Sequence, residues 1–250
     1  MKNVRAKKHL GQHFLNDQSI ASEIINLLNK NTQNVLEIGP GMGALTQLLL
    51  KKNYTTHVIE IDKESVTYLK QNFPNLNIHE GDFLKLNIKQ KYPFNFSLIG
   101  NFPYNISSQI LFKILDNRDQ ITEIVGMFQK EVAERVFCKH GRKRGILSVL
   151  LQTFYDIEYC RTVDAHVFTP QPKVKSAVLR LIRNKRKKLH INEKKFRLVV
   201  KSAFHQRRKK LSNALKGFKL VDYDKILNLL NLRAEQLSVE DFIKITSYVK

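Results

Sequence analysis

The stretch that decides the fold of this chain is Val35-Leu36-Glu37-Ile38-Gly39-Pro40-Gly41-Met42-Gly43. Its apolar half is typical of a short buried strand, and its glycines let the backbone turn sharply and pass close to a ligand. The leucines that follow recur on one face of a helix: Leu45, Leu48, Leu49 and Leu50. A strand that leads through a glycine-rich turn into a helix indicates an α/β sheet with a nucleoside cofactor at this edge, and a plain tight turn is the alternative.

Strands and helices keep alternating further along the chain. Apolar runs predict strands at residues 57–61, from residue 78, and at 96–100, 124–128, 148–154 and 177–182. Helices are expected around residues 66–70, after a cap at Ser107 or Ser108, and at residues 130–137. Strands that alternate with helices of this size predict a doubly wound parallel sheet, in a Rossmann-like α/β domain.

The pattern becomes helical after residue 183. Apolar residues at 196, 199, 200, 203 and 204 fall on one helix face, and residues 226, 227 and 230 mark a second helix. Ser238 followed by Asp241 resembles a capping box at the start of a last helix. We therefore expect one domain over residues 1–183 and a small all-helical domain over residues 184–250.

The chain of 250 residues carries 43 Lys and Arg against 22 Asp and Glu, which gives a net charge of +21. Such an excess favours a polyanionic partner, either nucleic acid or an acidic membrane surface. The basic residues gather in four parts of the chain, at residues 2–8, 139–144, 185–188 and 207–210. One basic run is usually only a solvated face, whereas four separate runs favour nucleic acid.

The two cysteines, Cys138 and Cys160, have neither the spacing nor the histidine neighbours of a metal site, so free thiols in a reducing compartment are expected. No apolar stretch of signal-peptide length follows the basic N-terminus, and no run approaches the ~20 apolar residues of a membrane span. These features predict a soluble, cytoplasmic protein with no membrane partner and no bound metal. Nothing in the sequence requires a dimer, so a monomer is expected.

Carboxylates stand at the ends of the first three predicted strands, at Glu37, Glu60 and Asp82. The carboxyl ends of parallel strands meet at the ligand-binding edge of such a sheet. Glu37 can orient the cationic amino-acid end of S-adenosylmethionine, directly or through water. Asp82 can accept a hydrogen bond from the adenine amino group of that cofactor. Together they favour S-adenosylmethionine.

A dinucleotide cofactor is the alternative that this region leaves open. Gly39, Gly41 and Ala44 also fit the pattern G-x-G-x-x-A, and Glu60 suits the ribose of either kind of cofactor. A nicotinamide enzyme, however, is expected to offer a substrate-binding His or Arg or a Ser-Tyr-Lys set. No such set is clearly placed in this sequence.

The tetrad Asn101-Phe102-Pro103-Tyr104 follows the fourth predicted strand. The side-chain oxygen of Asn101 and the backbone carbonyl before or at Pro103 can accept hydrogen bonds from an exocyclic amine. Tyr104 can stack on a planar base. A strand that ends in a common Pro-Tyr turn is the alternative. Because the tetrad follows earlier strands that end in carboxylates, we favour its interpretation as a binding site for an amine-bearing base over that of a plain turn.

In this order, the motifs resemble those of the adenine-N6 methyltransferases. Three further segments resemble the ribosomal RNA adenine dimethyltransferases: KHLGQHFL at residues 8–15, MFQKEVAER at 127–135 and FTPQPKV at 168–174. The resemblance runs from about residue 7 to 182. Within the family it is greatest to the branch that forms two neighbouring N6,N6-dimethyladenosines in a loop near the 3′ end of small-subunit (16S) RNA. It implies S-adenosylmethionine as cofactor and the immature small ribosomal subunit as partner.

The resemblance also implies the roles of individual residues. Residues 1–20 would cap the cofactor, and the cofactor pocket would be lined by His13, Leu15, Gly39, Glu60, Asp82 and Asn101. The target base would be held by Asn101 and the region of Pro103, with Tyr104 stacked on it and Phe168 closing the other side. The chain departs from the family pattern at Phe102, where Leu is commoner, and at His13, which is often Asn.

The implied reaction is an in-line displacement at the sulfonium methyl by adenine N6, with neither a covalent nucleophile nor a general base. The basic clusters and residues 184–250 would bind RNA phosphates, which makes binding steeply salt-dependent. Three alternatives stay open: an RNA-binding assembly factor in which catalysis is secondary, a large-subunit methylase of the macrolide-resistance type, and a DNA adenine methyltransferase.

Overall fold

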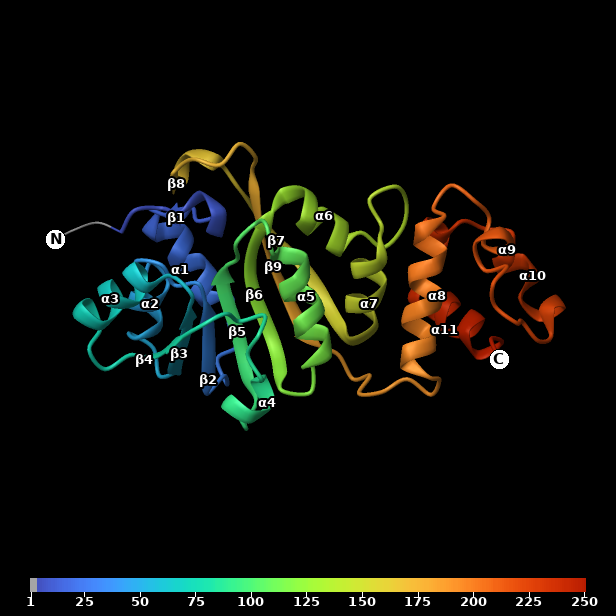
Figure 1. Cartoon of the computed structure of the whole chain (residues 1–250), viewed down its shortest axis with the longest axis horizontal. Coiled ribbons are helices and arrows are strands. Elements are labelled where there is room, and N and C mark those ends of the chain that lie inside the picture. Colours follow the sequence, from blue (N-terminus) through green and yellow to red (C-terminus); the bar gives the residue numbers. More distant parts are fainter. Residues whose placement is uncertain (1–3) are drawn as a thin grey trace. The chain divides into compact units, whose positions relative to one another are not determined.

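The computed structural model describes residues 4–250 (Figure 1). The chain forms two compact units, one of residues 4–133 with 157–183 and one of residues 134–156 with 184–250. Lys2, a member of the first basic cluster, lies outside the described residues. Residues 134–156 therefore group with the C-terminal region, and a domain formed by residues 184–250 alone stays a prediction.

A seven-stranded sheet flanked by helices forms the centre of the first unit (Figure 1). The strands lie in the order β4-β3-β2-β5-β6-β9-β7. Their bounds are β2 Asn34–Ile38, β3 Thr55–Glu60, β4 Asn77–Glu80, β5 Phe96–Asn101, β6 Ile121–Gln129, β7 Tyr155–Val163 and β9 Ser176–Arg183. The first five of these pair in parallel, so their carboxyl ends meet at one edge.

The predicted parallel sheet is confirmed for the five strands from β4 to β6, whereas β9 makes the sheet as a whole mixed. β9 runs antiparallel to β6, with Gly126 opposite Leu179. A parallel strand needs a crossover connection, usually through a helix. Between β7 and β9 the chain has only a 3-10 turn and the two-residue strand β8 (Phe168–Thr169), so β9 enters the sheet in the opposite direction.

The first half of the chain contains the four helices expected after the glycine turn, around residues 66–70, after residue 107 and at residues 130–137, together with two further helices, at residues 18–26 and 88–91, that were not predicted. They are α1 Gln18–Asn26, α2 Thr46–Leu49, α3 Lys63–Asn72, α4 Ile88–Lys91, α5 Ser107–Asp116 and α6 Lys130–Phe137. The predicted serine cap of α5 is wrong. The N-cap is Ile106, without a side-chain cap, because the buried Ser107 already lies in the first turn and donates its hydroxyl to the Pro103 carbonyl at 3.0 Å.

The strand predicted at residues 148–154 is also wrong, since these residues belong to helix α7 (Ile146–Phe154). Most of this helix is buried, and its sequence is short and largely apolar. A short continuous apolar run does not distinguish a buried strand from a buried helix. The strand begins only at Tyr155, the first residue of β7.

Helices make up most of the second unit, as predicted. They include α8 Glu193–His205, α9 Leu211–Ala214, α10 Leu227–Leu230 and α11 Val239–Ser247. The capping box is confirmed: the Asp241 amide donates to the Ser238 hydroxyl at 3.1 Å, and the Ser238 amide donates to the Asp241 carboxylate at 2.9 Å. Within residues 4–250, no helix combines the length and apolar character needed to cross a membrane.

The N-terminal segment is held against the first unit by a second, two-stranded sheet. Strand β1 (Phe14–Leu15) pairs antiparallel with β8, and the two lie side by side although more than 150 residues separate them (Figure 1). Leu15 faces Phe168 across this pair, and both side chains are buried. The pairing brings residues 9–16 to the edge of the large sheet where the carboxyl ends of its parallel strands meet.

Candidate functional site

A cavity of about 540 Å³ opens where β2, β3 and β5 end. The structure brings nearly all of the predicted site residues to its wall: His13, Leu15, Glu37, Gly39, Gly41, Glu60, Asp82, Asn101, Pro103 and Tyr104. Phe168 does not line this cavity. It is 3% exposed and packs in the apolar core with Leu15, so a place beside the target base requires this region to rearrange.

The glycine turn after β2 has the backbone conformation that its sequence predicts. Gly39, Gly41 and Gly43 have φ angles of 65°, 57° and 82°, in the left-handed region that side chains disfavour. A Cβ atom at Gly41 would also lie 2.7 Å from the ring of Phe14. The turn therefore lets the N-terminal segment approach the backbone at the cavity wall.

Glu60 joins the glycine turn to the end of β3. One carboxylate oxygen accepts from the Gly41 amide at 3.0 Å, and the other accepts from the Asp62 amide at 2.9 Å. Burial raises the pKa of Glu60, whose side chain is almost wholly enclosed. A carboxylate offers about four acceptor positions, so lone pairs remain for the hydroxyl groups of a ribose.

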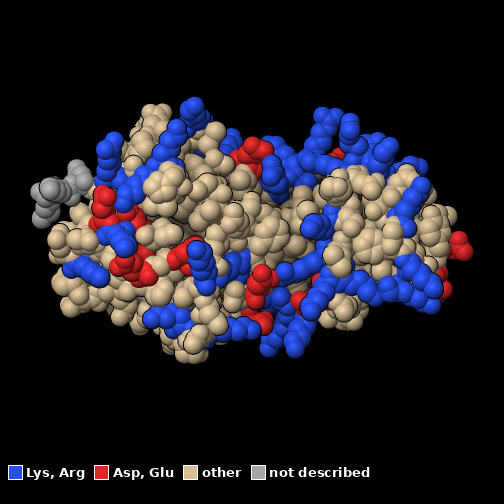
Figure 2. All heavy atoms as spheres, in the orientation of Figure 1, with Lys and Arg blue, Asp and Glu red and all other residues tan. Residues whose placement is uncertain are grey.

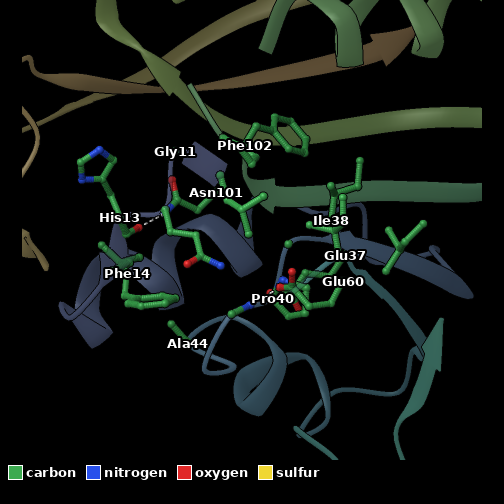
Figure 3. A pocket seen from close by; sticks show the side chains of 18 of the residues that line it. Gly11, His13, Phe14, Glu37, Ile38, Pro40, Ala44, Glu60, Asn101 and Phe102 are labelled. Carbon is green, nitrogen blue, oxygen red and sulfur yellow. Dashed lines mark hydrogen bonds between the residues drawn. The ribbon is translucent and has the colours of Figure 1, made fainter. Parts of the chain in front are cut away.

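Glu37 is buried at the floor of the same cavity, next to Glu60 (Figure 3). The Thr46 hydroxyl donates to its carboxylate at 2.6 Å. Burial, together with the negative charge of Glu60, raises the pKa of Glu37 to about 8. The carboxyl group is therefore mainly protonated at neutral pH, and a cation in the cavity would favour its ionised form.

The raised pKa of Glu37 predicts how stability depends on pH. Between pH 4.5 and about 8 the folded protein binds a proton at Glu37 that the unfolded chain has lost. The free energy of unfolding therefore falls as the pH rises through this window. We expect urea denaturation at a series of pH values to show a flatter profile for Glu37→Gln than for the wild type. Parallel profiles for the two proteins would contradict this assignment.

Asp82 lies in a loop that a lysine of helix α5 holds in place. The Leu84 amide donates to the Asp82 carboxylate at 2.8 Å. Lys113 donates to the carbonyls of Leu84 and Leu86, each at 2.7 Å, and its ammonium lies 5.7 Å from the centre of the Phe83 ring. Sequence reasoning missed Lys113, although a lone lysine between apolar residues of one helix was a usable signal.

Ile61 is a second residue that sequence reasoning missed. It directly follows Glu60, lines the cavity and is 49% exposed. Cofactor sites are lined mainly by apolar groups with a few placed polar ones, so an exposed isoleucine at the rim suits a planar base. The signal was present, because an apolar residue just beyond an acidic strand end has no place in the core.

Asn101 has its side chain fixed by the N-terminal segment. Its amide nitrogen donates to the His13 carbonyl at 2.7 Å, which leaves the amide oxygen as a free acceptor (Figure 3). The Pro103 carbonyl already accepts from the Ile106 amide at 3.2 Å and from Ser107. A carbonyl oxygen has two lone pairs, and these two bonds occupy both of those on Pro103. The carbonyl of Phe102 is therefore the better second acceptor for an amine.

The side chain of Phe102 points away from the cavity, toward β6 (Figure 3). It is fully buried, and its ring packs on Phe128 with centroids 5.0 Å apart. The departure from the commoner leucine is therefore accommodated in the core and does not alter the pocket wall.

Tyr104 already carries an aromatic neighbour on its ring. His13 stacks on it with centroids 5.3 Å apart, and an imidazole nitrogen of His13 lies 2.6 Å from the Pro170 carbonyl. The Tyr104 hydroxyl is hydrogen-bonded to Ser176. A base stacked on Tyr104 must therefore displace His13 or use the opposite face of the tyrosine ring.

The sequence matches the family model described as ribosomal RNA adenine dimethylase over residues 3–250. It is 58% identical to the ribosomal RNA small subunit methyltransferase A of Cytophaga hutchinsonii, an alignment that covers 99% of this chain and 98% of that protein. The protein of the same name from Flavobacterium johnsoniae is 56% identical over 100% of this chain and 98% of its own length.

Solved structures show the same architecture. A dimethyladenosine transferase from Plasmodium falciparum superimposes with a TM-score of 0.80 at 25% identity, covering 95% of this chain and 99% of that chain. The 23S rRNA methyltransferase ErmE superimposes with a TM-score of 0.74 at 23% identity, covering 94% and 99% of the two chains, and supports the fold alone.

Proposed function

Because the chain belongs to the ribosomal RNA adenine dimethylase family, we propose that it transfers methyl groups from S-adenosylmethionine to adenine N6 in small-subunit (16S) ribosomal RNA. The products are two adjacent N6,N6-dimethyladenosines in a loop near the 3′ end of that RNA. The observation that carries the proposal is the side chain of Asn101, whose nitrogen donates to the His13 carbonyl and whose oxygen remains to accept from an amine.

The residues of the cavity suit S-adenosylmethionine. Ile61 offers an exposed apolar surface for the adenine, Asp82 can accept from its amino group, and the remaining lone pairs of Glu60 can accept from the ribose. Glu37 can compensate the charge of the methionyl end by ionising. When bound, this cofactor supplies an electrophilic methyl group on a sulfonium.

The protein's own contribution to the reaction is orientation. The N6 lone pair of adenine is delocalised into the ring, which makes it a poor nucleophile. If Asn101 Oδ1 and the Phe102 carbonyl accept from both N–H groups, the nitrogen becomes pyramidal and its lone pair points along one line. Fixed acceptors also stabilise the positive charge that develops on this nitrogen. The proton then leaves to solvent.

The substrate is an RNA whose target base can leave its stack. A base inside a helix cannot reach a cavity at a sheet edge, so an unpaired loop is the natural target. Basic side chains are spread in patches over both units in the face that Figure 2 shows, while acidic ones form a few small groups. We assign residues 184–250 to RNA binding, with the exposed run Arg208, Lys209 and Lys210 among the phosphate contacts.

Two assays test this function. Methyl transfer from labelled S-adenosylmethionine to immature small subunits is expected, and mass spectrometry of the RNA should find two adjacent dimethylated adenines in the small-subunit RNA. Modified adenines confined to large-subunit RNA would instead support the macrolide-resistance type of activity. An assembly role is a second outcome: a catalytically inactive variant that still supports subunit maturation would show that RNA binding dominates.

A further inference from the structure

We infer that Lys7 and Gln12 are positioning residues for methyl transfer, because they fasten the N-terminal segment to Asp62 and so hold the carbonyl that orients Asn101. We call residues 7–16 the N-terminal strap. The inference rests on the proposed function of Asn101. It assigns a catalytic consequence to contacts with Asp62, which follows β3, whereas the tetrad begins at the end of β5.

The strap forms one whole side of the cavity. Every residue from His9 to Asn16 lines it. The Phe14 side chain reaches across to the glycine turn, where its ring is in contact with Gly41 (Figure 3). The strap therefore touches the parts of the cavity assigned to the cofactor as well as those assigned to the target base.

The strap is fastened to Asp62, whose side chain is only 1% exposed. Lys7 forms an ion pair with this carboxylate and lies 3.0 Å from the carboxylate of Glu64. Gln12 donates to the second oxygen of Asp62 at 3.1 Å and accepts from the Lys7 amide at 2.8 Å. Two side chains of the strap thus converge on one buried charge.

Asp62 is itself tied to the cofactor side of the site. Its amide donates to Glu60 at 2.9 Å, and its carboxylate accepts from the Ser65 hydroxyl at 3.1 Å at the start of α3. Although burial acts to raise the pKa of Asp62, the hydrogen bonds from Lys7 and Gln12 hold it below the ordinary value. The anchor is therefore a charged group, and removing Lys7 leaves that charge buried without its counter-ion.

The backbone of the same strap meets Asn101 and Asn105, through carbonyls that lie between the two anchors and directly after them in the sequence. Asn101 donates to the His13 carbonyl at 2.7 Å, and the exposed Asn105 donates to the His9 carbonyl at 3.3 Å. Gln12 and His13 are neighbours in the chain, so a strap detached from Asp62 also frees the His13 carbonyl. The Asn101 amide can then rotate and present its nitrogen, a donor, to the target amine, which needs an acceptor.

Lys7→Met tests the inference, with Lys8→Met as the matched control. The two changes remove the same charge at adjacent positions, but Lys8 is exposed and Lys7 alone faces Asp62. Without RNA, we expect S-adenosylhomocysteine to dissociate from Lys7→Met at least about tenfold faster than from the wild type, the scale of losing one partner of a buried charge pair. Dissociation from Lys8→Met should match the wild type.

The second readout is the single-turnover rate of methyl transfer to small subunits at saturating cofactor. At saturating cofactor, the rate of Lys7→Met should still be at least about tenfold lower than that of the wild type. Lys7→Arg should restore the rate, because arginine can pair with the same carboxylate. Gln12→Ala, which keeps the ion pair, should give a smaller loss of the same kind and covers the case that Lys7→Met does not fold.

Two results would overturn the inference. If Lys7→Met and Lys8→Met behave alike without RNA, Lys7 does not fasten the strap. If saturating cofactor fully restores the rate of Lys7→Met, the strap retains cofactor but does not orient Asn101. The dissociation of S-adenosylhomocysteine is measured without RNA and does not depend on the proposed function. If the proposed function is wrong, the wild-type protein will methylate no small-subunit RNA, whatever the dissociation rates are.

Discussion

Replacing Asn101 by alanine is expected to lower the single-turnover rate of methyl transfer by about 10²–10³-fold, the loss typical of removing one fixed hydrogen-bonding group that acts on developing charge. The side-chain oxygen is the acceptor that aligns the target nitrogen, and its orientation is fixed by the 2.7 Å bond from the amide nitrogen to His13. Alanine removes both the acceptor and its support. Transfer of labelled methyl groups to small subunits at saturating cofactor measures the effect.

Asn95→Ala is the matched control, because Asn95 is an exposed asparagine just before the opposite end of the same strand, β5. We expect its rate to equal that of the wild type. Tyr104→Ala tests the stacking partner in the same assay and should be slow as well. If both Asn101→Ala and Tyr104→Ala kept the wild-type rate, the tetrad would not hold the target base.

The cofactor edge was predictable because its polar residues lie at or just beyond the ends of predicted strands. Glu37 and Glu60 lie at the ends of β2 and β3, and Asp82 lies two residues after β4, so their meeting at one edge follows from the topology of an α/β sheet. The glycine turn was equally readable, since its φ angles are those that only glycine adopts easily. Local pattern and strand order together were sufficient for these residues.

Long-range contacts could not be predicted in the same way. Nothing in the sequence around Lys7 indicates that it meets Asp62, and the pairing of β1 with β8 that buries Phe168 depends on packing. Phe168 illustrates the limit: its segment resembles the family motif, yet in the structure its ring lies in the core. Similarly, the short and largely apolar run of residues 148–154 suited a buried strand as well as a buried helix.

The Phe102 ring has room in the core because two glycines face each other in the sheet. Gly100 on β5 is the register partner of Gly126 on β6. A Cβ atom at Gly126 would lie 2.2 Å from the Phe102 ring, and one at Gly100 would lie 2.9 Å from it. The ring therefore occupies the space that these residues leave by lacking side chains.

We accordingly expect Gly126→Ala to lower the free energy of unfolding by about 3 kcal/mol, at the upper end of the usual cost of overpacking. Phe102→Leu alone leaves a small void and should cost about 1–2 kcal/mol. In the double variant the shorter leucine makes room for the new methyl group. Its loss of stability should therefore be clearly smaller than the sum of the two single losses, with a coupling of about 1–3 kcal/mol.

Gly217→Ala is the control for the glycine substitution itself, since a Cβ atom there would meet nothing within 4 Å and φ is not positive. Its stability should stay within about 0.5 kcal/mol of the wild type. Urea denaturation of the wild type, the two single variants and the double variant measures the cycle. Additive losses would mean that Phe102 and Gly126 do not share this space.

Because the ring points away from the cavity, Phe102→Leu should also keep the wild-type rate of methyl transfer, and a large loss of rate would place Phe102 at the site after all.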